Sequence, residues 1–244
     1  MPKAGKGKTM IIKNTNDVQQ SNGIKILVYG EAGAGKTRLI STLPTPFVID
    51  VENRLLSITG NGIAYKDVKS TDDLIEVYTW LVSSEEAKQY ESIVVDSISE
   101  LSEICYLEEV RREAEAAKQE NRKVNSYAPY GNMASSMINF TKKLLLINKH
   151  VYFIARLDRS NDELNRIVYN PATAGQKLAQ TLPHLFDEFF ALRVEKDNNG
   201  VERGVLQCTR NNAWHCRDAS GKLSAFETPD LGAIIRKIGG HNGE

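Results

Sequence analysis

The sequence has few cysteines, no long apolar run and no excess of charge of either sign. Its three cysteines are too few and too irregular for a disulfide framework, which favours a reducing compartment. No apolar run reaches the roughly 18 residues of a membrane-spanning helix, and the basic N-terminus lacks the apolar stretch of a secretory signal. A formal net charge of zero means that any nucleic-acid surface must be a local patch. We therefore expect a cytoplasmic protein without a membrane partner.

What the sequence does contain suits one sizeable α/β domain. The chain has 244 residues, of which 41% are hydrophobic and 25% are charged, as in ordinary globular proteins. Residues 1–20 are polar and lysine-rich and predict a flexible basic tail. The folded core is expected to cover residues 21–240.

Apolar runs and helical periodicity alternate through the first 155 residues, which predicts a mainly parallel sheet flanked by helices. A polar, turn-rich segment at 156–178 is interpreted as a loop, and two later strands around a turn at 198–200 predict antiparallel C-terminal hairpin strands. Strands are expected at 24–29, 47–51, 65–68, 93–96, 151–155, 186–194 and 204–209, and helices at 37–43, 71–82, 98–123, 133–148 and 229–237.

Residues 30–37 fit the phosphate-loop pattern G-x-x-x-x-G-K-[ST] at every position, between an apolar strand and a helix. Glycines allow the backbone N–H groups to approach phosphate oxygens, the lysine neutralises the β- and γ-phosphates, and the hydroxyl coordinates Mg²⁺. We therefore predict ATP and Mg²⁺ as cofactors, with Lys36 as a catalytic residue and Thr37 as a metal ligand. The predicted nucleotide-binding residues are Gly30, Glu31, Ala32, Gly33, Ala34, Gly35, Lys36, Thr37 and Arg38.

Two acidic positions complete the predicted site. Asp96 ends the apolar strand 93–96 and is the second candidate metal ligand, although it could also cap the helix that follows. Glu52 comes just after the strand that follows the phosphate-loop helix, where a carboxylate can activate the attacking water. Asp50 competes for this role, and Glu52 could instead be a solvated loop acid.

Five segments together resemble the RecA-like ATPases, and in particular the Sak-type single-strand annealing ATPases of phages. The resemblance covers 22–240 and implies ATP-dependent binding of single-stranded DNA in recombination or annealing. It also implies a single-strand DNA-binding protein as partner, a homo-oligomer, and a location in the host cytoplasm. The segments are GEAGAGKT (30–37), FVIDVEN (47–53), SIVVDSISEL (92–101), HVYFIARLDR (150–159) and NPATAGQKLAQTLPHLFDEFFAL (170–192).

The sequence departs from this family at two positions. The strand that ends near Ala155 usually carries a polar γ-phosphate sensor, and here the next residue is Arg156. A C-terminal lysine-rich motif that reaches the neighbouring subunit's nucleotide is replaced by a stretch in which Arg217 is the trans-acting candidate, with a surface arginine as the alternative.

Cations and an aromatic residue in the expected loop suit single-stranded DNA, because they offer charge for phosphates and a ring for stacking. The candidates are Arg159, Arg166, Tyr169 and Lys177. Acidic residues in the same loop weaken the patch, so a plain solvated loop is the alternative. The segment 111–130 is a second candidate, in which interleaved charges favour a solvated helix.

Three functions fit these features. The first is a DNA-stimulated ATPase. The second is a small-molecule kinase in which 156–159 closes as a lid. The third is a non-catalytic module in which bound nucleotide orders a loop.

Overall fold

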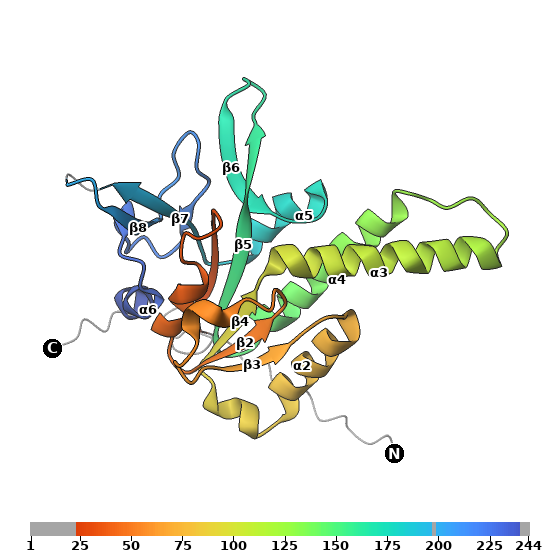
Figure 1. Cartoon of the computed structure of the whole chain (residues 1–244), viewed down its shortest axis with the longest axis horizontal. Helices are drawn as coiled ribbons and strands as arrows, with labels where there is room; N and C mark the ends of the chain where they lie inside the picture. The colour runs from red at the N-terminus through yellow and green to blue at the C-terminus, as the bar shows by residue number, and fades with distance from the viewer. Residues whose placement is uncertain (1–22, 197–198, 240–244) are drawn as a thin grey trace, which may run out of the picture.

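A single twisted sheet forms the centre of the molecule (Figure 1). The structure is a computed structural model, and it describes residues 23–196 and 199–239. The sheet order is β10-β8-β7-β1-β5-β4-β2-β3, with β6 paired to β5 and β9 paired to β7. The strands are β1 (Lys25–Gly30), β2 (Pro46–Asp50), β3 (Ala64–Asp67), β4 (Ser92–Asp96), β5 (His150–Asn161), β6 (Ile167–Ala172), β7 (Glu188–Lys196), β8 (Glu202–Gln207), β9 (Arg217–Asp218) and β10 (Phe226–Glu227).

The central strands are parallel because helices return the chain to the same edge between them. β1 lies between β5 and β7, and β5 separates β1 from β4. The antiparallel pairs are at the C-terminal side and in the β5–β6 hairpin. The prediction of a mainly parallel sheet with antiparallel C-terminal strands is confirmed, and the fold is that of a P-loop NTPase.

Alternate residues of β1 build two separate cores, since successive side chains of a strand point to opposite faces. Leu27 and Tyr29 belong to one core, which is covered by α2 (Thr71–Ser83), α3 (Ile98–Gln119), α4 (Ala128–Leu145) and α5 (Gln176–Thr181). Ile26 and Val28 belong to the other, which is covered by two short 3₁₀ helices, η2 (Thr37–Thr42) and η3 (Leu55–Ile58), and by α6 (Leu231–Gly239). The helix expected at 37–43 is thus a shorter 3₁₀ helix.

The segment 156–178 is not a loop, and this prediction was wrong. β5 continues to Asn161, and β6 pairs with it from Asn161↔Ile167 to Arg156↔Ala172. The carboxylate of Asp162 forms the turn by accepting hydrogen bonds from the backbone N–H groups of Leu164 and Arg166, at 2.9 and 2.8 Å. The resulting hairpin stands out from the sheet, and α5 follows at its foot (Figure 1).

α3 and α4 lie side by side and extend together away from the sheet (Figure 1). At the far end, Arg122 forms ion pairs with Glu113 and Glu120, and Arg112 pairs with Glu109. The paired cations of 111–130 therefore neutralise carboxylates of the same segment, as expected for a solvated helix.

The predicted tail 1–20 and the first residue of the turn 198–200 lie outside the described residues. Within the part of the chain that is described, no helix is long and apolar enough to cross a membrane.

Candidate nucleotide-binding site

The phosphate loop leaves the sheet at the end of β1. Gly30 pairs with Arg156 of β5 on one side and with Leu192 of β7 on the other. A Cβ at Gly30 would lie 2.4 Å from the carbonyl oxygen of Leu192, so only glycine fits this position. Gly33 and Gly35 have φ angles of 80° and 100°, a region that L-residues with side chains rarely adopt. The sequence of the loop therefore matches its backbone.

Lys36 is held in the mouth of the loop. Its Nζ atom donates hydrogen bonds of 2.7 Å to the carbonyl oxygens of Gly30 and Glu31. The buried hydroxyl of Tyr152 on β5 donates a 3.0 Å hydrogen bond to the carbonyl oxygen of Lys36, which fixes the backbone beneath it. Burial lowers the pKa of Lys36, while the nearby carboxylates of Asp96 and Glu52 oppose that shift.

Asp96 lies at the end of β4, opposite the start of η2. It is only 4% exposed, and its Oδ2 atom accepts a 2.8 Å hydrogen bond from the hydroxyl of Thr37. Burial raises the pKa of Asp96 to about 6; the Thr37 hydroxyl opposes the shift, and the charge of Glu52 adds to it. The alternative role of Asp96 as helix cap does not apply, because the side chain of Ser97 caps α3 by accepting from the N–H of Glu100.

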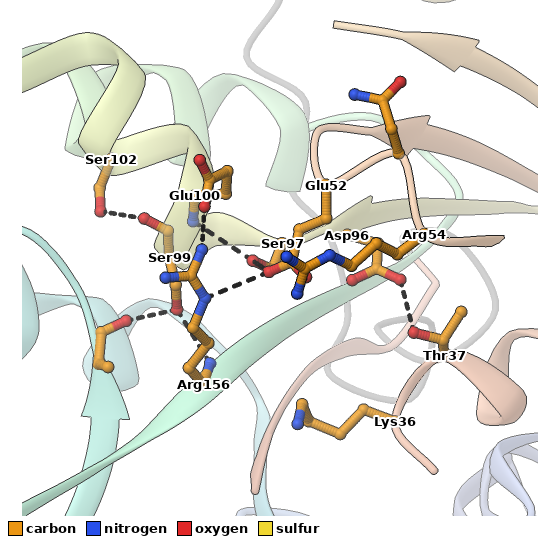
Figure 2. A network of polar contacts seen from close by, with 12 residues as sticks. Lys36, Thr37, Glu52, Arg54, Asp96, Ser97, Ser99, Glu100, Ser102 and Arg156 are labelled. Atoms are coloured by element: carbon orange, nitrogen blue, oxygen red, sulfur yellow. Dashed lines mark hydrogen bonds and ion pairs between the residues drawn. The ribbon is translucent and has the colours of Figure 1, made fainter. Parts of the chain in front are cut away.

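Glu52 faces the same opening. The backbone N–H of Glu52 donates a 3.2 Å hydrogen bond to the carbonyl oxygen of Asp96, which ties the segment after β2 to the end of β4. Its Oε1 atom accepts hydrogen bonds from the hydroxyl of Ser97 at 2.5 Å and from Nε of Arg156 at 3.3 Å (Figure 2). Nη1 of Arg54 lies 3.9 Å from Oε2.

The competing acid, Asp50, lies elsewhere. Its Oδ1 atom accepts a 2.9 Å hydrogen bond from the backbone N–H of Asn53, and it lines a separate cavity of about 790 Å³ with residues of η3 and β3. Asn53 adopts a positive φ of 54° after the strand. The structure therefore places Glu52, and not Asp50, beside the phosphate loop.

A cavity of about 690 Å³ joins these groups and is large enough for a nucleotide. Its chemistry also fits ATP·Mg²⁺: lysine and backbone N–H groups for phosphate oxygens, and a hydroxyl and a carboxylate for a hard cation. Lys36 would hold the phosphates, and Thr37 and Asp96 would hold the ion. The lining residues are Glu31, Ala32, Gly33, Gly35, Lys36, Thr37, Arg38, Glu52, Arg54, Ser57, Asp96, Ser97, Ile154, Arg156 and Leu157.

The DNA-binding candidates occupy the hairpin and α5, outside this cavity. Arg159 and Lys177 are exposed and form no ion pair among the described residues. Arg166 pairs with Asp162, with Nη2 2.7 Å from Oδ2. Tyr169 is half-buried, and its ring stacks on Trp214 with centroids 4.2 Å apart. The first two are therefore the freest cations, and Tyr169 already has an aromatic partner inside the chain.

Arg217 lies in β9, away from the phosphate loop. It is half-buried, and its Nη2 atom donates hydrogen bonds to the carbonyl oxygens of Phe186 and, at 3.4 Å, Pro183. The structure therefore shows Arg217 bound to its own chain; a contact with a neighbouring subunit stays a prediction.

Sequence reasoning missed the groups that surround Glu52. Arg54 follows β2, and Ser97 and Glu100 follow β4. Arg156 was noted as a departure from a family pattern and as part of a possible lid, but not as a partner of Glu52. Glu100 and Arg156 form an ion pair across the start of α3. Helix-cap chemistry around Ser97 was the one available signal, since serine followed three residues later by glutamate marks a helix start.

The fold and this cavity define the class of protein: a P-loop ATPase with its nucleotide site at the carboxyl ends of parallel strands. The family model of the AAA domain matches residues 22–220, and the chain therefore belongs to the AAA domain family of nucleotide-binding ATPases. No curated protein matches the sequence.

Proposed function

We propose that this protein binds ATP·Mg²⁺ in the phosphate-loop cavity and hydrolyses it, with Glu52 as general base. The observation that carries the proposal is the convergence of Lys36, Thr37, Asp96 and Glu52, from three separate strand ends, on one cavity. Such convergence is costly for stability, because Lys36 and Asp96 are largely buried and the like charge of Glu52 lies near Asp96.

In the proposed reaction, Glu52 takes a proton from water as the water oxygen bonds to the γ-phosphorus and the bond to the β-phosphate bridge oxygen breaks. ADP and phosphate leave, and Glu52 returns the proton to solvent. Lys36 neutralises charge on the β- and γ-phosphates. Bound Mg²⁺ would add charge stabilisation for the phosphate oxygens.

We further propose that the protein acts on single-stranded DNA in phage recombination or annealing. It would work as a homo-oligomer, with a single-strand DNA-binding protein as partner. The five segments that resemble the Sak-type ATPases support this proposal. The free cations Arg159 and Lys177, which lie on the projecting hairpin and at its foot, also support it. A kinase lid at 156–159 receives no support, because these residues are part of β5 and pair with β6.

The substitution Glu52→Gln tests the proposal. It keeps the shape and the hydrogen bond from Ser97 but removes the base, so turnover should fall by roughly 10²–10⁴-fold while ATP binding persists. Phosphate release and binding of a fluorescent ATP analogue measure the two effects. Asp50→Asn is the matched control, two residues away in the other cavity, and should keep wild-type turnover. Full activity of Glu52→Gln would exclude Glu52 as the base, and tight ATP binding by a wild-type chain without turnover would favour the non-catalytic module.

A further inference from the structure

A second cavity, of about 710 Å³, lies between the β5–β6 hairpin, α5 with the short η5 (Leu182–Leu185) that follows it, and the segment 208–217. That segment rises beside the hairpin (Figure 1). The cavity is about as large as the nucleotide cavity and shares no lining residue with it. The buried Phe189 and Cys216 form an apolar part of its wall. Because an inorganic anion would fill little of this space, a ligand that fits it is an organic molecule or part of one.

Contacts between the segment 208–217 and the hairpin fix the shape of the cavity. The backbone N–H of Tyr169 on β6 donates a 2.7 Å hydrogen bond to the carbonyl oxygen of Ala213, and the ring of Tyr169 stacks on Trp214. Within the segment, Oδ1 of Asn211 accepts hydrogen bonds from the N–H groups of Ala213 and Trp214, at 2.9 and 2.7 Å. The cavity is therefore formed before a ligand arrives, which reduces the entropy lost on binding.

Three carboxamide side chains line the cavity and are free to bind a ligand. Asn170 lies on β6, in register with Asp158 of β5, and Gln176 and Gln180 lie one turn apart on α5. Among the described residues, none of these three amide groups forms a hydrogen bond. A carboxamide has a donor and an acceptor side by side, and it forms two hydrogen bonds with N6 and N7 of adenine. The amides therefore suit the edge of a nucleobase.

The charges of the lining favour an anion. Arg210 is exposed and Arg217 is half-buried, and neither guanidinium forms an ion pair within the part of the chain that the structure describes. Among the lining residues, Asp158 alone has a carboxylate. His215 lies near Arg210: burial, and then the positive charge of Arg210, lowers the pKa of His215. Arg210, the more exposed of the two arginines, is thus available to a phosphate group.

We propose that this cavity takes one unstacked deoxynucleotide, with adenine as the preferred base: Gln176 and Gln180 bind the base edge, and Arg210 binds the phosphate. A strand is the source that the surroundings favour, because Arg159 on the same hairpin would hold a neighbouring phosphate. In this respect the inference rests on the proposed function. An acidic peptide fits less well, since Asp158 would repel its carboxylates but can accept a hydrogen bond from a base amino group.

Binding of oligonucleotides to the full chain, measured by fluorescence anisotropy at several salt concentrations, tests the base contact. The wild type should bind an oligodeoxyadenylate about tenfold more tightly than an oligothymidylate of the same length, the discrimination of one bidentate pair. Gln176→Ala/Gln180→Ala should abolish this preference and keep the salt slope, because amides release no counterions. Arg210→Ala should weaken both oligonucleotides equally and reduce the slope by about 0.7, because a phosphate contact carries no sequence information.

Two matched controls lie outside the cavity. Gln119→Ala removes an exposed amide at the end of α3, and Arg236→Ala removes an exposed cation on α6. Both should behave as the wild type, and thermal unfolding of each variant checks that it is folded. Equal affinity of the wild type for the two oligonucleotides, or a preference that survives in Gln176→Ala/Gln180→Ala, would overturn the assignment of the base edge to these amides.

Calorimetry with mononucleotides separates the two sources of the ligand. It uses Lys36→Ala, which lacks the lysine of the phosphate loop, and compares 2′-deoxyadenosine 5′-monophosphate with the thymidine compound. A preference for adenine in this titration but no binding of oligonucleotides means that the cavity takes a free nucleotide and that the proposed action on DNA fails. A preference seen with oligonucleotides alone means that the cavity takes a nucleotide within a strand.

The opposite failure is also distinct. If both oligonucleotides bind equally and the two mononucleotides do not differ, the cavity has no base preference: the inference is overturned and the proposed action on DNA stands. Displacement of the adenine mononucleotide by an aspartate-rich peptide, without any difference between the two oligonucleotides, would overturn the inference in favour of a peptide site.

Discussion

The hydroxyl of Thr37 donates a 2.8 Å hydrogen bond to Oδ2 of Asp96, although 59 residues separate the two in sequence. This contact joins the start of η2 to the end of β4. The hydrogen bond from Thr37 and the nearby charge of Lys36 offset only part of the cost of burying the Asp96 carboxylate. The pKa of Asp96 therefore rises to about 6. The site is therefore built at the expense of stability.

Asp96→Asn should make the nucleotide-free protein more stable and remove Mg²⁺-dependent turnover. A folded pKa of about 6, above the ordinary 3.8, means that the stabilising protonated form is present at low pH and is lost as the pH rises from about 4 to 6. Above pH 6 the cost is about 3 kcal/mol at most, so the amide should recover roughly 1–3 kcal/mol. Urea denaturation from pH 4 to 8 measures it.

Asp67→Asn is the control for this prediction, since Asp67 is exposed at the end of the neighbouring edge strand β3. It should change neither the stability profile nor turnover. Equal stability of Asp96→Asn and the wild type at every pH would show that the folded protein does not hold Asp96 with a raised pKa.

Lys36→Ala should lose ATP binding and turnover and keep the fold. Among the residues that the structure describes, its ammonium bonds to the loop carbonyls of Gly30 and Glu31, so its removal leaves the core untouched. The loss of charge stabilisation should lower kcat/KM by about 10²-fold or more. Isothermal titration with ATP and phosphate-release assays measure both effects. Arg38→Ala is a matched control at the exposed edge of the cavity and should have a smaller effect. Wild-type ATP affinity of Lys36→Ala would move the nucleotide out of this cavity.

The phosphate loop could be predicted because its chemistry is local: eight consecutive residues between a strand and a helix carry the glycines, the lysine and the hydroxyl. The place of Asp96 followed from the apolar run that it ends. Glu52 was predicted as the base with Asp50 as its competitor, but the residues alone could not exclude Asp50, because the outcome depends on how the chain turns after β2, where Asn53 adopts a positive φ. Two acids so close in sequence face different cavities.

The contact between Arg156 and Glu52 could not be predicted either, because it depends on the order of strands. β5 lies between β1 and β4, and this order brings residues 104 positions apart to one edge of the sheet. The hairpin was mistaken for a loop for a different reason. Beyond Leu157 every residue of β5 is exposed, so no apolar alternation marks this strand where it leaves the sheet.

Arg159→Ala/Lys177→Ala should weaken binding of single-stranded DNA. These cations are exposed and have no acidic partner among the described residues, so they can replace counterions on phosphates. Loss of two contacts should reduce the slope of log affinity against log salt by about 1.4. Fluorescence anisotropy at several salt concentrations measures affinity and slope together. Arg166→Ala is the matched control: Asp162 already neutralises Arg166, so its effect should be smaller. An unchanged slope in the double variant would exclude this face as the DNA-binding surface.

The wild-type protein should lose stability at high pH as Glu188 ionises, and Glu188→Gln should remove that loss. Glu188 begins β7 and is 1% exposed, and its Oε2 atom has no hydrogen-bond partner in the described part of the chain. Its register partner on β9 is the acidic Asp218. Burial, followed by the charge of Asp218, raises the pKa of Glu188 to about 8.

Since this pKa is above the ordinary 4.5, the stabilising protonated form is complete below about pH 4.5 and is lost as the pH rises through 8. The wild-type free energy of unfolding should therefore fall by about 2 kcal/mol or more between pH 5 and 9, and that of Glu188→Gln should fall less. Urea denaturation at each pH measures the difference. Glu195→Gln, on the exposed end of the same strand beside Arg193, should follow the wild-type profile. Parallel profiles for the wild type and Glu188→Gln would mean that Glu188 is ionised in the folded protein at neutral pH, and that the 217–220 segment holds the charge through the N–H of Ser220.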